Sequence, residues 1–280
     1  MLYDAVFFIG LSYAINTLLG FLITGFVFIV ILCSELRRNR TFRIIALLCV
    51  VDLIQLFCFA VGSVVVIGGE RSIHNRPCIE KFAGALIQGS WMAMAYLELA
   101  LAVNRLSVIT GQKWLKIVEI ASLVISVVVG VYYTLSLLLT PTHAHMDPEI
   151  LTWKSYHTTP FTMYNFKIAF GLFCIYIAVK KVVTRWNEIR FLVAVIGGFV
   201  YTLFLACFYH YWYDIFNESR TVWVIQHHAW IFLFTFVCSL HLWFNSELRK
   251  NALKLLRRQN KVVVSSVEVY VVNAEDSYRV

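Results

Sequence analysis

The sequence has few charged residues, few prolines and no long polar segment. Charged side chains make up 14% of its 280 residues, apolar ones make up 60%, and the mean hydropathy is +0.74. Soluble domains hold about 25% charged and about 45–50% apolar residues, and one core of this size could not bury so much apolar surface. The scarcity of charge therefore excludes a soluble enzyme, a disordered chain and a small secreted disulfide scaffold.

Other missing features narrow the class of membrane protein. The four prolines lie at or near the ends of apolar runs, so the sequence lacks the paired broken helices and internal repeats typical of transporters. No metal-ligand spacing or nucleophile–base pair indicates an enzyme in the bilayer. The last apolar run, residues 221–246, contains no lysine that could form a Schiff base with retinal. We therefore expect neither an enzyme nor a retinal photoreceptor.

Seven apolar runs are long enough for membrane-spanning helices, each of which needs about 20 mostly apolar residues. None alternates apolar and polar residues as barrel strands do. We therefore expect an all-α, membrane-embedded seven-transmembrane helix bundle with a short amphipathic cytoplasmic helix after the last span. The predicted spans lie near residues 9–33, 44–68, 82–109, 115–139, 161–183, 189–213 and 222–245 of a seven-transmembrane domain at 1–259, with the surface helix at 246–258 and a cytoplasmic tail at 260–280.

Basic residues are distributed unequally between the two sides of these spans. Of the 24 lysines and arginines, 18 fall in the odd-numbered loops and the C-terminal tail, and 6 fall on the other side. Because basic loops stay in the cytoplasm, we expect an outer N-terminus and a cytoplasmic C-terminus in a multi-pass plasma-membrane protein. Residues 246–258 place apolar side chains at helical spacing among basic ones, which suits a helix lying on the anionic inner leaflet.

Two acidic residues lie inside predicted spans, where a charge costs about 2.5–3.5 kcal/mol. Asp52 is near the middle of the second span, and Glu98 in the third precedes Arg105 by seven residues. Seven residues are about two helical turns, so Glu98 and Arg105 share a face that Gln88 and Trp91 continue outward. This stripe should face the bundle interior, where Glu98 has either a functional role or a structural hydrogen bond.

Three further polar features have simpler interpretations. Glu119 follows Lys116 by about one turn, and we expect the two to form a local ion pair. His227 and His228 are adjacent, so at most one can readily face a pocket. A His-Ala-His pair at positions 143 and 145 is too weak a pattern to indicate a metal, and we predict no metal and no cofactor.

Four local strings resemble the rhodopsin-like G-protein-coupled receptors. LELALAVNRLSVI (97–109) resembles the end of that family's third span, with Asn104-Arg105-Leu106 where an acid-Arg-aromatic triplet is usual. ALLCVVDLIQL (46–56) resembles the second span, with Asp52 at the position of the family acid. Phe204-Xaa-Xaa-Cys207-Phe208 resembles the switch of the sixth span, and LHLWFNSELRK (240–250) resembles the end of the seventh span and the surface helix.

The departures from that pattern narrow the resemblance. Val237 and Cys238 replace the Asn-Pro pair of the seventh span, His241 replaces its tyrosine, and His210 replaces the proline of the sixth. These losses, together with the Asn-Arg dipeptide, are similar to those of the nematode serpentine chemoreceptors, class T or its relatives. The resemblance covers roughly residues 10–256.

The resemblance implies a chemosensory receptor for a small external ligand, such as an odorant or a metabolite, that signals to a cytoplasmic heterotrimeric G protein and contacts the lipid bilayer but no nucleic acid. The alternative is a transporter or channel subunit, with Asp52, Glu98 and Lys167 lining a polar pathway. Counting along helical faces places the ligand site in the outer half of the bundle, at Ile87, Gln88, Trp91, Lys167, Tyr211, His227 and Ile231. The resemblance implies coupling and switch residues at Asp52, Glu98, Asn104, Arg105, Phe208 and His241.

Three details of these sites follow from residue chemistry. Asn104 cannot offer Arg105 a carboxylate. An ion pair that holds Arg105 in the resting state would therefore need another acid, and Glu188 is the nearest candidate. Asp52 should act by hydrogen bonds, because its expected neighbours Met94 and Val237 cannot bind sodium. The aromatic site suits a small, fairly apolar and weakly acidic ligand, unless its aromatics are interfacial anchors and its lysine extends to the headgroups.

Overall fold

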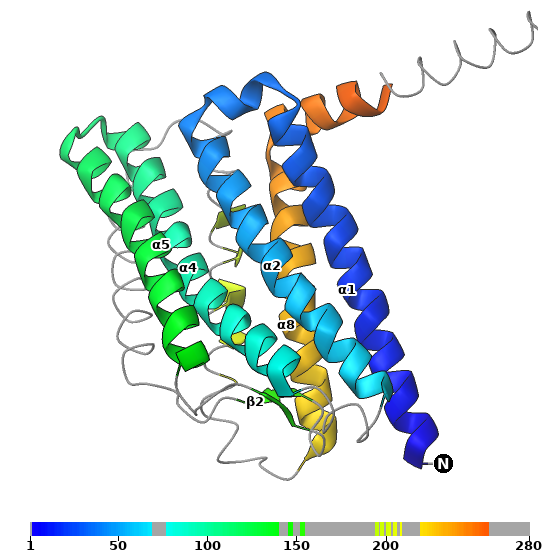
Figure 1. Cartoon of the computed structure of the whole chain (residues 1–280). Coiled ribbons are helices and arrows are strands. Elements are labelled where there is room, and N and C mark those ends of the chain that lie inside the picture. The colour runs from blue at the N-terminus through cyan, green and yellow to red at the C-terminus, as the bar shows by residue number, and fades with distance from the viewer. Residues whose placement is uncertain are drawn as a thin grey trace, which may run out of the picture.

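The apolar runs form long helices that pack side by side in a bundle (Figure 1). The structure, a computed structural model, describes residues 2–68, 77–139, 145–147, 152–154 and 219–257, with scattered helical positions between 194 and 208. The long helices are α1 (Leu2–Leu32), α2 (Arg40–Gly68), α4 (Pro77–Thr110), α5 (Trp114–Leu139) and α8 (Arg220–Phe244). Each is long and apolar enough to cross a membrane. The prediction of an all-α membrane bundle is confirmed.

The predicted spans and the helices differ mainly at their first turns. α1 starts at Leu2 rather than residue 9, and α4 starts at Pro77 rather than residue 82. The extra turns carry polar residues such as Asp4 and Glu80, which a count of apolar residues leaves out. α8 corresponds to the seventh predicted span, whereas the fifth predicted span lies outside the described residues and the sixth lies only partly within them.

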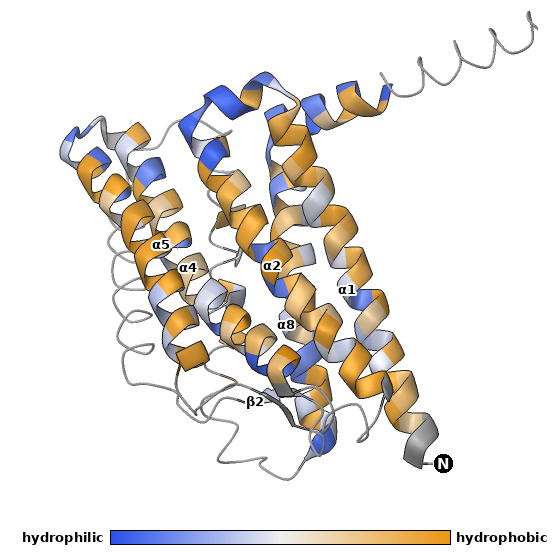
Figure 2. Cartoon of the chain, in the orientation of Figure 1, coloured by the Kyte–Doolittle hydropathy of each residue, from blue (hydrophilic) through white to orange (hydrophobic). Residues whose placement is uncertain are grey.

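Many large apolar side chains are exposed on the outside of the bundle, and Figure 2 shows that α1 and α5 consist mostly of hydrophobic residues. Phe8, Leu22 and Val127 are each more than 60% exposed, which suits contact with lipid rather than water. Packing between the helices relies on small residues instead. A Cβ added to Gly89 of α4 would lie 2.6 Å from the carbonyl oxygen of Gly130 on α5. Glycine therefore permits the close contact between these two helices.

The two ends of the bundle differ in structure. At one end, the 3-10 helix η1 (Glu35–Arg38) joins α1 to α2, and Arg38 pairs with Glu35 at 3.0 Å. We call this the basic end. At the other end, the antiparallel strands β1 (His145–Asp147) and β2 (Thr152–Lys154) contact α4 and α8, and Trp153 is buried in the core. We call this the hairpin end; the hairpin was not predicted from the sequence.

A further helix at residues 246–257 leaves the basic end of α8 and turns away from the bundle (Figure 1). It begins because the Asn245 side-chain oxygen accepts hydrogen bonds from the backbone N–H groups of Glu247 and Leu248, both at 3.1 Å, which is an N-cap. Leu248 and Ala252 are buried in the core, so the apolar face of this surface helix is anchored to the bundle.

Candidate functional site

A buried carboxylate joins three helices at the basic end. Glu119 of α5 is 1% exposed, and its Oε1 lies 2.6 Å from Nε of Arg40 on α2. Its Oε2 accepts a hydrogen bond of 3.1 Å from Nδ2 of Asn104 on α4. The Asn104 oxygen in turn accepts a 2.6 Å hydrogen bond from the hydroxyl of Thr41 on α2. We call Arg40, Thr41, Asn104 and Glu119 the basic-end network.

The start of α2 positions two members of this network. Asn39 caps the helix, because its side-chain oxygen accepts a 3.0 Å hydrogen bond from the backbone N–H of Thr41. The cap places Arg40 at the rim of the bundle, where its side chain is 36% exposed and reaches inward to Glu119. The carboxylate thus receives both an ion pair and a hydrogen bond, as a buried charge requires.

The structure corrects the predicted local pair of Glu119 with Lys116. Lys116 is exposed, whereas Glu119 faces the interior and pairs with Arg40 instead. The sequence contains a signal that would have indicated this, because Glu119, Ser122, Ser126 and Gly130 follow one another at helical spacing and all four are buried. Small and polar residues on one face of a membrane helix mark the face that packs against protein.

Arg105 and His241 lie next to the basic-end network. Asn104 is 4% exposed and the adjacent Arg105 is half-buried. His241 of α8 is buried, close enough to Arg105 for their charges to interact. The structure therefore brings three predicted coupling residues together, while Glu188, the predicted source of a carboxylate, lies outside the described residues.

The middle of the bundle holds both intramembrane acids of the sequence analysis. Asp52 is buried, and Cys238 and Glu98 are close enough for their charges to affect it. Glu98 lies within hydrogen-bonding reach of Thr202, one of the described positions of the sixth predicted span. The sulfur of Met94, an expected neighbour of Asp52, accepts a 3.7 Å hydrogen bond from Nε2 of Gln55.

Phe208 is also among the described positions, and its ring lies 6.0 Å from that of Phe204. Both belong to the string that resembles the switch of the sixth span. Phe208 is half-buried and Phe204 is exposed.

Ring contacts and a histidine–serine contact hold α8 to its neighbours towards the hairpin end. The ring of His227 is 1% exposed and lies 4.2 Å from the ring of Tyr13 on α1 and 5.1 Å from that of Phe59 on α2. Nε2 of His228 lies 3.0 Å from the hydroxyl of Ser12. We call Ser12, Tyr13, Phe59, His227 and His228 the histidine cluster; its adjacent histidines both contact α1.

An aromatic contact between α4 and α8 lies at the level of the predicted ligand site. The rings of Trp91 and Trp230 are 5.9 Å apart in an edge-to-face arrangement. Ile87 and Ile231 are buried, and Gln88 is half-buried. Lys167 and Tyr211 lie outside the described residues. The structure thus brings Trp91 to α8 through Trp230, which the sequence analysis did not select.

Gln226 is a second residue that the sequence analysis missed. Its side chain is 2% exposed, and neither amide atom makes a hydrogen bond within the described part of the chain. It shares a face of α8 with Trp223 and Trp230 through spacings of three and four residues, a pattern that could have indicated it. A buried amide without partners calls for an explanation, and a bound polar group would supply one.

Comparison of the sequence with known protein families finds a match to one family model. The sequence model of the serpentine-type seven-transmembrane G-protein-coupled chemoreceptor family Srt matches residues 5–264. A comparison with curated proteins finds no match. The family match includes every described helix except the first turn of α1.

Proposed function

The chain belongs to the serpentine-type Srt family of seven-transmembrane chemoreceptors, and we propose that it binds a small external ligand and signals to a cytoplasmic heterotrimeric G protein. In this proposal the protein lies in the plasma membrane, the hairpin end faces outward, and the basic end and C-terminus face the cytoplasm. The excess of basic residues at the basic end supports this orientation.

The basic-end network is the main observation that supports G-protein coupling at this end of the bundle. It holds Asn104 inside the bundle and so fixes the turn of α4 that presents Arg105 at the membrane exit. Glu119 accepts the hydrogen bond of Asn104 and pairs with Arg40, which ties this turn of α4 to α5 and α2. In our mechanism, ligand binding favours a state in which the sixth span moves away and opens a cavity beside Arg105 for the G protein.

Asp52, Glu98, Phe208 and His241 complete the proposed switch between ligand and G protein. In the middle of the bundle Asp52 is buried and Glu98 is half-buried, and Glu98 reaches Thr202 of the sixth predicted span. A displacement of the sixth span would change this contact directly. The proximity of Asp52 and Glu98 also favours the second candidate function, an ion pathway, for which ligand-driven current would be the sign.

We propose that the ligand binds between α4 and α8, within the half of the bundle nearer the hairpin. Trp91, Trp230 and the apolar Ile87 and Ile231 support an aromatic, largely apolar site. Gln226 adds a polar group whose donor and acceptor a ligand could satisfy. Gln88, Lys167, Tyr211 and His227 complete the proposed set, and Lys167 would favour a weakly acidic ligand.

A screen of odorants and small metabolites in cells, read as G-protein activation, tests this function. Once an agonist is found, Trp91→Ala should weaken the response at normal surface expression. Gln226→Leu should do the same without loss of stability, because the Gln226 side chain makes no hydrogen bond to any of the residues that the structure describes. Tyr132→Ala, on the exposed face of α5, is the control. Unchanged responses in both pocket variants, or current without G-protein activation, would contradict the proposal.

A further inference from the structure

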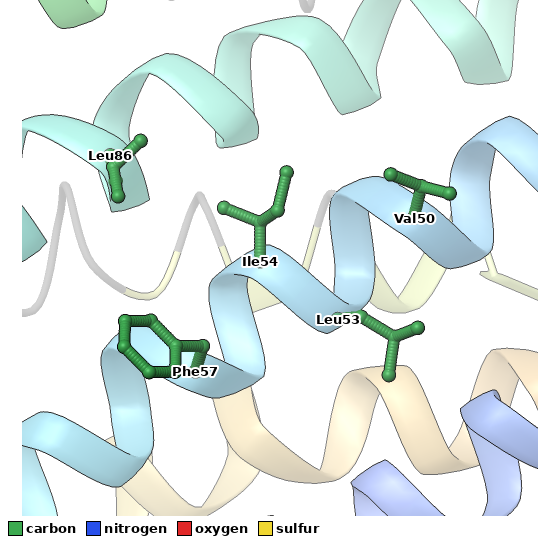
Figure 3. Close-up of a pocket in the computed structure, with 5 residues that line it drawn as sticks. All are labelled: Val50, Leu53, Ile54, Phe57 and Leu86. Atoms are coloured by element: carbon green, nitrogen blue, oxygen red, sulfur yellow. The ribbon is translucent and has the colours of Figure 1, made fainter.

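The outer surface of the bundle carries an apolar groove whose lining includes none of the proposed ligand and coupling residues. The groove lies at α2 and α4 and has a volume of about 340 Å³. Its lining is wholly aliphatic or aromatic: Val50, Leu53, Ile54, Phe57 and Leu86. Figure 3 shows Val50 and Ile54 on α2 and Leu86 across from them on α4. Val50, Ile54 and Phe57 are each 37% or more exposed, so the groove is open to the surroundings of the bundle.

A basic side chain lies in line with the groove. Arg43, Val50 and Phe57 are spaced by seven residues, which places them on one face of α2. Arg43 is exposed, and within the described residues its side chain makes no ion pair. The neighbouring Arg40, by contrast, is committed to Glu119. Arg43 is therefore available to a ligand that occupies the groove.

The distances along α2 match the dimensions of one lipid leaflet. At 1.5 Å per residue, Arg43 lies about 10 Å from Val50 and about 16 Å from Ile54 along the helix axis. Half of the hydrocarbon core of a bilayer is about 15 Å thick. A phosphate at Arg43 would therefore place its acyl chain along Val50 and end it near Ile54, at the middle of the membrane.

We propose that this groove binds an acyl chain of an anionic phospholipid from the leaflet at the basic end, with the lipid phosphate paired to Arg43. The apolar lining accepts the chain. Arg43, whose side chain makes no ion pair within the described residues, favours a headgroup of net negative charge over a zwitterionic one that carries the same phosphate. The inference goes beyond the proposed function and shares with it only the orientation, because the cytoplasmic leaflet is the anionic one.

Photolabelling in nanodiscs tests the proposal without any agonist or G protein. The full chain is reconstituted with phospholipids that carry a diazirine in the acyl chain and either a serine or a choline headgroup, at equal mole fraction. Mass spectrometry then locates the labelled residues. The serine lipid should label residues 50–54 about fivefold more than the choline lipid, the preference expected from one arginine near the surface.

Two pairs of variants separate the contributions of charge and groove. Arg43→Gln should remove the headgroup preference, whereas Lys116→Gln, an exposed cation at the same end on α5, should retain it. Ile54→Trp should fill the groove and lower labelling by both lipids, whereas Val127→Trp on the exposed face of α5 should leave it unchanged.

Equal labelling by the two lipids in the parent protein, or an intact preference in Arg43→Gln, would overturn the proposal. The groove would then be a lipid contact without headgroup selectivity from Arg43. A sterol that displaces both lipids equally would also overturn it, because the occupant would then be uncharged. Failure of G-protein activation would leave this labelling result unaffected, so the two proposals fail independently.

Discussion

The basic-end network and the histidine cluster hold helices together by different means. The network joins α2, α4 and α5 through a buried carboxylate whose charge is met by Arg40 and Asn104. The cluster joins α1, α2 and α8 through stacked rings and a histidine–serine contact. Charge in a low-dielectric interior is costly unless it is paired, whereas rings and hydroxyls tolerate small changes. The network should therefore be the more sensitive of the two to single substitutions.

Loss of Arg40 should have the largest effect. Arg40→Ala leaves Glu119 buried without its cation, and removal of one partner of a buried pair costs about 3–5 kcal/mol. Thermal unfolding in detergent should show a large fall in Tm. Arg38→Ala is the matched control, because its pair with Glu35 is exposed and worth at most about 1 kcal/mol. Equal falls in Tm in the two variants would show that the basic-end network stabilises the protein no more than the exposed ion pair does.

The double variant Arg40→Ala with Glu119→Gln sharpens this test. Glutamine keeps a hydrogen-bonding group for Asn104 and removes the unpaired charge, so the double variant should be more stable than Arg40→Ala alone. Additive losses of stability would mean that the two side chains do not interact.

The contact between α4 and α5 should be the next most sensitive feature. Gly89→Ala places a methyl group against the backbone oxygen of Gly130, and overpacking against backbone costs about 3 kcal/mol at the upper end of its range. It should also weaken the network, because Asn104 and Glu119 belong to these two helices. Gly25→Ala, whose added Cβ meets nothing within 4 Å, should be close to neutral in the same unfolding measurement.

The histidine cluster should respond to shape rather than to charge. His227→Ala removes two ring contacts worth roughly 1 kcal/mol each, a loss of about 2 kcal/mol. His227→Phe retains a ring between Tyr13 and Phe59 and should recover most of that stability. If phenylalanine proves as damaging as alanine, polar contacts of His227 dominate and the comparison with the network must be revised.

The smallest expected effect concerns the hydroxyl of Ser12. Ser12→Ala removes its contact with His228 and should cost about 1 kcal/mol. The neighbouring Asn16 continues to donate to the carbonyl oxygen of His228, so α1 should remain attached to α8. Unfolding measurements that show a loss as large as that of Arg40→Ala would contradict the ranking of the two regions.

The sequence predicts the architecture better than the partners of its polar residues. Apolar run length is enough to place α1, α2, α4, α5 and α8, because a bilayer requires helices of a set length. The pair between Glu119 and Arg40 depends on the rotation of two helices far apart in sequence, which run length does not determine. The hairpin around Trp153 is too short for a clear alternating pattern.

The candidate site was predictable to a similar, partial extent. The string around Asn104 and Arg105 could be placed at the basic end from the sequence, because its resemblance to known receptors includes its position in the third span. The contacts of His227 with α1 could not, because adjacent histidines on a helix do not reveal which neighbour each one faces. Gln226 was missed because a single amide carries no motif.

Nucleotide exchange on purified heterotrimeric G proteins, catalysed by the receptor in nanodiscs, tests the central claim most directly. The parent protein should accelerate exchange, and Arg105→Ala should abolish the acceleration at an unchanged Tm. Arg37→Ala, which removes an exposed arginine from the same end, should couple as the parent does. Normal exchange with Arg105→Ala, or equal losses in both variants, would contradict the assignment of Arg105 as the coupling residue of the basic end.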